Sequence, residues 1–123
     1  MPGEVVPYFD AARRDYDSGR HRECIQKCRD VRNLMEKHLG ASKGHPVGDA
    51  MADLAGLPLP QDQRRFLNQC WIALVDLTSA AHHQMAYSTA DARACLLLTA
   101  VLCEYLQMLL AAPPLGYGAR TTP

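Results

Sequence analysis

Apolar residues recur every three or four positions over five stretches of the chain, which is the spacing of one face of an α-helix. These stretches are about residues 7–18, 20–39, 47–55, 61–81 and 88–112. The clearest stripe belongs to the second stretch and consists of Cys24, Ile25, Cys28, Val31, Leu34 and Met35. No stretch alternates apolar and polar residues over the length of a strand. The pattern predicts an all-α protein, an antiparallel bundle of four to five helices.

Residues that start or stop helices lie at the borders of these stretches. Gly19 and Gly40 each follow a stripe and suit the left-handed conformation that ends a helix. Ser88 and Asp91 have the three-residue spacing of an N-terminal capping box, so the last helix is expected to begin there. The short turn at Gly19 predicts that the first two helices are antiparallel neighbours.

The fourth stretch carries a long apolar stripe, and the segment 82–87 after it is predicted to be a turn. The members of that stripe are Phe66, Leu67, Cys70, Trp71, Leu74 and Leu77. Pro113 and Pro114 stop the last helix. With 123 residues, the chain is expected to form one core. We therefore predict a single helical bundle domain over residues 1–112 and a mobile C-terminal tail over residues 113–123.

The last helix is apolar nearly all the way round. Its most apolar part, Ala94–Leu110, is shorter than a membrane span and contains Glu104, so no membrane association is expected. Such a helix has to be covered on most sides, either centrally within one bundle or by a second copy. With about four substantial helices, self-association is expected, as a homodimer or with a protein partner. The residues predicted to form this interface are Leu98, Val101, Leu102, Tyr105 and Leu106.

Composition limits the classes of function. Hydrophobic residues make up 48% of the chain and the formal net charge is zero, which argues against a protein that coats nucleic acid or binds an acidic membrane. The first residues lack the basic start and apolar run of a signal peptide, and the five cysteines fit reduced thiols, so a cytoplasmic location is expected. Cys24 and Cys28 share a helix face, but no second ligand pair accompanies them. No metal or other cofactor is expected.

The adjacent residues His82 and His83 are the most noticeable polar feature. They lie between two helices, so both rings are expected at one end of the bundle, where a site can form. A general base needs a partner group within reach, and Asp76, Ser79 and Asp91 are the nearby candidates. A structural or capping role for the two histidines is the alternative.

Two known families share features with this sequence. Tyr16–Ile25 has the aromatic residue and glycine turn of a tetratricopeptide hairpin, but tetratricopeptide arrays require several copies and no second copy follows. The helix at Cys24–Arg32, then Ser79–His83, then Ser88–Arg93 opening an apolar last helix, is similar to the HEPN domains (higher eukaryotes and prokaryotes nucleotide-binding). The likeness is greatest to those of bacterial abortive-infection and other antiphage defence proteins. The resemblance implies a helical bundle that dimerises.

Many HEPN domains are metal-independent ribonucleases that depend on an arginine followed by a histidine after four to six residues. By position His82 or His83 matches that histidine, but no arginine precedes either one at this spacing. The first hypothesis is therefore a non-catalytic HEPN-like domain that acts through protein–protein interaction as a dimerisation, adaptor or regulatory module. The alternative is a HEPN-type ribonuclease or toxin acting on RNA, in which His82 or His83 works with Arg93, which approaches from the partner chain near a two-fold axis.

Overall fold

The computed structural model describes residues 5–40, 46–56, 59–83 and 88–111, except for the side chains of residues 54–55, 80–83 and 109–111. Within these ranges the chain forms five α-helices and no strand. In chain order they are α1 (Val5–Asp17), α2 (His21–Leu39), α3 (Val47–Ala55), α4 (Gln61–His83) and α5 (Thr89–Ala111). The predicted all-α bundle is confirmed. The predicted tail, 113–123, lies outside the described residues.

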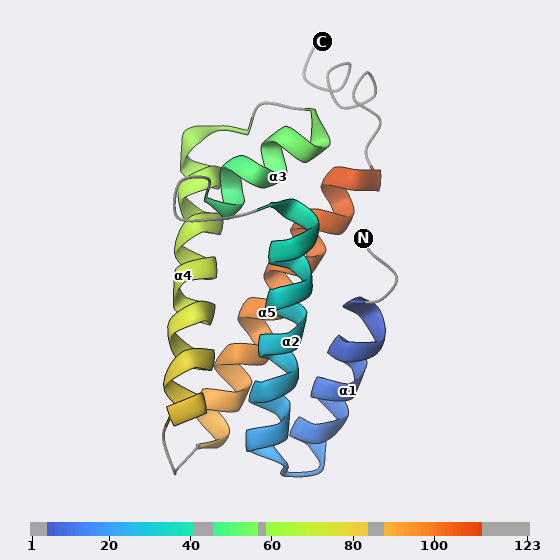
Figure 1. Ribbon diagram of the computed structural model, residues 1–123, viewed down its shortest axis with the longest axis vertical. Helices are drawn as coiled ribbons and strands as arrows, with labels where there is room; N and C mark the ends of the chain where they lie inside the picture. The colour runs from blue at the N-terminus through green and yellow to red at the C-terminus, as the bar shows by residue number, and fades with distance from the viewer. Residues whose placement is uncertain (1–4, 41–45, 57–58, 84–87, 112–123) are drawn as a thin grey trace.

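Four helices lie lengthwise beside one another, and the short α3 crosses one end of the bundle (Figure 1). Helices α2 and α5 each contact all four of the others, so they form the centre of the bundle. The inner side of the apolar last helix is thus covered by helices of its own chain, whereas Leu97 and Met108 of the same helix stay exposed. None of the helices in the described ranges combines the length and the hydropathy that crossing a membrane requires.

The core forms where the apolar stripes of α2, α4 and α5 meet. Cys103 of α5 lies against Met35 of α2, with 3.8 Å between the two sulfur atoms. On α4 the buried side chains are Leu67, Cys70, Leu74 and Thr78. The assignment of Phe66 to the buried stripe was wrong, because its side chain is 46% exposed. Phe66 precedes Leu67 by one residue, a rotation of about 100° that places it at the edge of the stripe.

The helix ends follow the predicted capping residues. Gly19 and Gly40 have φ values of 77° and 70°, the left-handed conformation expected of them. At the start of α5, the amide of Asp91 donates to Ser88 Oγ at 3.0 Å, and the amide of Ser88 donates to Asp91 Oδ2 at 3.1 Å. This is a reciprocal capping box.

A turn was predicted to begin at residue 82, but the helix continues further. His82 and His83 are the last two residues of α4. No glycine or proline lies between Leu77 and Tyr87, so nothing in the side chains stops the helix before them.

A close approach between α3 and α4 depends on Gly48. Its amide donates to Asn68 Oδ1 at 2.6 Å, and a Cβ at Gly48 would lie 2.6 Å from the carbonyl oxygen of Arg64. Backbone cannot rotate away as a side chain can, so α3 would have to move. Gly48→Ala is expected to lower the free energy of unfolding by about 1–3 kcal/mol, despite the higher helix propensity of alanine. Urea denaturation measures this change, with the exposed Gln69→Ala as control, and unchanged stability would contradict the close contact.

Candidate functional site

The two predicted histidines and Arg93 belong to the same end of the bundle. His82 and His83 close α4, and Arg93 lies in the second turn of α5, which begins six residues after α4 ends. Figure 1 shows this end of α4 next to the start of α5. The side chain of Arg93 is exposed. The side chains of His82 and His83 lie outside the described residues, so the structure brings the three positions to one end and gives no orientation for the two rings.

A third histidine lies at this end of the bundle, and sequence reasoning missed it. His21, the first residue of α2, has its Nε2 atom 3.4 Å from Thr89 Oγ1 at the start of α5. Its ring centroid is 6.3 Å from that of Tyr16. The contact joins positions 68 residues apart, and no spacing in the sequence signals it. The starts of α2 and α5 therefore meet at the bundle end.

The nearby acid at this end is already used in a structural contact. Hydrogen bonds from the backbone and side chain of Ser88 lower the pKa of Asp91. Its Oδ2 atom caps the start of α5 by accepting a hydrogen bond from the Ser88 amide. The described groups at this end include the His21 imidazole, the Thr89 hydroxyl and the exposed Arg93 guanidinium, all of which can form hydrogen bonds.

The predicted interface residues divide into two groups. Leu102 and Leu106 are fully buried within the single chain, where a partner does not reach them. Both were predicted to lie at an interface with a partner, but they belong to the core of the single chain. Leu98, Val101 and Tyr105 are half-buried and partly accessible. Because α5 is apolar on nearly every side, its sequence pattern does not distinguish the inner face from the outer one.

The accessible apolar surface lies along the outer side of α5 and the neighbouring edge of α4. The Phe66 and Tyr105 rings lie 6.2 Å apart, which places the start of α4 beside the last part of α5. The exposed Leu97 stands four residues before Val101, and the exposed Met108 stands three residues after Tyr105. Residues three or four apart share one side of a helix, so Leu97 and Met108 lie on the same side of α5 as Val101 and Tyr105. We call this surface the outer row. It consists of Phe66, Leu97, Val101, Tyr105 and Met108.

All five cysteines are free and buried. Burial raises the pKa of the Cys95 and Cys103 thiols to about 12, and a hydrogen bond with Cys28, followed by burial, raises that of Cys24. Protonated thiols are poor nucleophiles at neutral pH, so Cys24, Cys95 and Cys103 act as small core residues. Among the described side chains, no group of three or more His, Cys, Asp or Glu residues is arranged to hold a metal ion.

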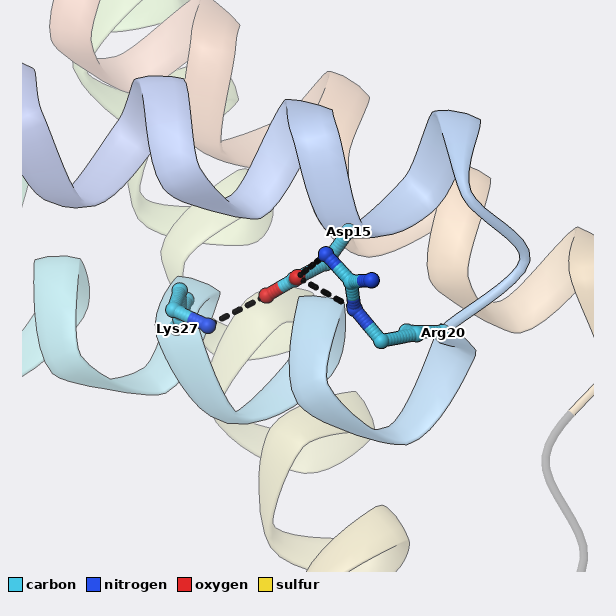
Figure 2. A network of polar contacts seen from close by, with 3 residues as sticks. All are labelled: Asp15, Arg20 and Lys27. Carbon is cyan, nitrogen blue, oxygen red and sulfur yellow. Dashed lines mark hydrogen bonds and ion pairs between the residues drawn. The ribbon is translucent and has the colours of Figure 1, made fainter.

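The tightest polar network in the described structure joins α1 to α2. Buried Asp15 of α1 receives Arg20 Nε at 2.9 Å and Nη2 at 2.7 Å on one carboxylate oxygen, and Lys27 Nζ on the other (Figure 2). These contacts, led by the Lys27 hydrogen bond, lower the pKa of Asp15, although burial opposes them. Asp15 was not among the residues predicted from the sequence to be functional. The network holds the first helical hairpin together and does not form an open site.

The bundle end and the outer row are two exposed surfaces on which a function can be based. At the bundle end, the Asp91 carboxylate takes part in the cap of α5. The outer row exposes large apolar groups side by side. Comparisons of the chain with models of protein families, with curated proteins and with solved structures found no match.

Proposed function

We propose that this chain is a non-catalytic helical domain that acts by binding another protein surface, in the first place a second copy of itself. The outer row carries the proposal. Its members Phe66, Leu97 and Met108 are 46%, 56% and 65% exposed, although each is large and apolar. Single exposed apolar residues are ordinary, whereas a contiguous exposed row is typical of an interaction surface.

The charges beside the outer row favour a second copy as the partner. Arg93 and Glu104 are both exposed and stand eleven residues apart on α5, about three helical turns, so they share one side of the helix. A two-fold axis brings each patch against its own copy. If two α5 helices pair antiparallel across such an axis, Arg93 faces the partner's Glu104, and the same pair forms a second time.

The order of the helical segments along the chain suggests the kind of system in which the domain works. A cytoplasmic HEPN-like homodimer, serving as a dimerisation or adaptor module in an abortive-infection or other antiphage defence system, fits the order of Cys24–Arg32, Ser79–His83 and Ser88–Arg93. The missing arginine before His82 and His83 favours association over catalysis.

Light scattering over a range of micromolar concentrations tests self-association. The mass of the unmodified chain is expected to rise from 13.6 kDa towards twice that value. Leu97→Glu combined with Met108→Glu is expected to keep the protein monomeric with an unchanged melting temperature, because both side chains are exposed in the single chain. A folded monomer at every concentration would contradict self-association.

A charge reversal tests the pairing of Arg93 with Glu104. Arg93→Glu turns two attractive pairs into two repulsive ones, so the dissociation constant is expected to rise about tenfold. Adding Glu104→Arg restores the attraction and is expected to restore the original value. Arg14→Glu, an equal charge change at an exposed position of α1, serves as control.

A further inference from the structure

A buried arginine in the middle of α2 has no carboxylate partner in the described structure. Arg32 is 8% exposed, and its Nε atom is buried without a hydrogen-bond acceptor. Its Nη2 atom donates to Asn33 Oδ1 at 3.1 Å, a neutral group. The ion pairs of Asp10, Asp15 and Asp49 are made with other basic residues and do not include Arg32.

Helical geometry places Arg32 on the side of α2 that faces α4. Lys27 reaches Asp15 of α1 from one flank of α2, and Met35 faces Cys103 of α5. Around the axis of α2, Arg32 lies about 140° from Lys27, which is further round than Met35 in the same direction. Since Lys27 faces α1 and Met35 faces α5, the next long helix that packs on α2 in this direction is α4. Asn33 is exposed, so the tip of the Arg32 guanidinium that contacts it lies at the rim of the α2–α4 boundary.

The surroundings of the Arg32 guanidinium destabilise its positive charge. Arg29 is half-buried on the same flank, three residues earlier. Burial first, and repulsion from Arg29 second, lower the pKa of Arg32, while the exposed Glu36 opposes them. A guanidinium keeps its charge in proteins, so the positive charge stays partly withdrawn from water without forming an ion pair.

We propose that Arg32 binds an oxyanion group, a phosphate or a carboxylate, at the rim of the α2–α4 boundary. The planar guanidinium presents paired N–H donors, which match two oxygens of such a group. The amide nitrogen of Asn33 supplies a further donor at the exposed edge. The site is separate from the outer row, and it does not depend on the proposed association.

Thermal unfolding at constant ionic strength tests this site. Sodium phosphate and sodium acetate are each titrated against sodium chloride at fixed pH. A saturable rise in melting temperature is expected with at least one of the two anions, because a ligand that binds only the folded state stabilises it. The anion that gives the larger rise identifies the source of the oxyanion. Arg32→Met is expected to weaken the affinity at least about tenfold, whereas Arg65→Met, an exposed position on α4, is expected to leave it unchanged.

The Arg32 variants separate binding from general salt effects. Phosphate also stabilises proteins by exclusion from their surface, and that effect persists in every variant. Equal gains in the unmodified protein and in Arg32→Met, or no saturable gain with either anion, would overturn the proposal. Should Arg32→Met not fold, Arg32→Lys decides the matter. It keeps the charge but loses the paired donors, and we expect it to bind at least severalfold more weakly, while unchanged binding would count against the site.

Discussion

Leu106→Asp is expected to abolish cooperative folding. Leu106 is fully buried on the inner face of α5, the helix that contacts all four others. A carboxylate placed there has no partner in the described core, and an unpaired buried charge costs about 3–5 kcal/mol or more. Since the whole stability of a domain of this size is about 5–15 kcal/mol, most of it should be lost. Circular dichroism during urea titration measures the loss of the folding transition.

Met108→Asp is the matched control for this experiment. Met108 stands two residues further along α5 and is 65% exposed. The same new charge is expected to change the free energy of unfolding by at most about 0.5 kcal/mol, because it stays in water. Similar destabilisation by the two substitutions would show that the inner and outer faces of α5 are assigned wrongly.

Asp15→Asn is expected to lower the free energy of unfolding by about 2 kcal/mol at neutral pH. Asp15 is the buried carboxylate that receives both Arg20 and Lys27, and an amide replaces two charge-assisted contacts by weaker ones. The folded-state pKa of Asp15 lies below its usual value, so its contribution is present above that usual value, about 3.9. The contribution is lost as the pH falls through the folded-state pKa.

Denaturation as a function of pH tests the sign of this linkage. The difference in stability between the unmodified protein and Asp15→Asn is expected to be constant near neutral pH and to shrink on acidification below about pH 4. Asp17→Asn, at an exposed position of the same helix, is expected to show little difference at any pH. A difference for Asp15→Asn that does not change with pH would mean that packing, and not charge, supports the hairpin.

The local features of the fold could be predicted from the sequence because they depend on neighbours along the chain. The apolar stripe of residues 20–39 belongs to α2 (His21–Leu39), and Gly40 caps it as expected. The spacing of Ser88 and Asp91 gave the start of α5, since a capping box needs only these two side chains. The extent of α4 was underestimated, because two histidines carry no signal that stops a helix.

The parts that could not be predicted depend on contacts between distant residues. Periodicity alone does not show which side of an apolar helix is inner, so Leu102 and Leu106 were grouped with Val101 and Tyr105. The outward positions of Leu97 and Met108 follow only from the packing of α5 against its four neighbours. Similarly, nothing in the local pattern of α2 shows that Arg32 is buried without an anionic partner.

The methyl signals of the methionines report directly on association through the outer row. In protein labelled with ¹³C at the methionine methyl groups, a dilution series measures each methyl environment separately. We expect the Met108 signal to change with protein concentration, because this side chain is 65% exposed on the outer row. The signals of Met35 and Met51, which are fully buried in the single chain, should stay constant and serve as internal controls. A Met108 signal that stays constant up to the highest concentration at which the protein remains folded would contradict association through the outer row.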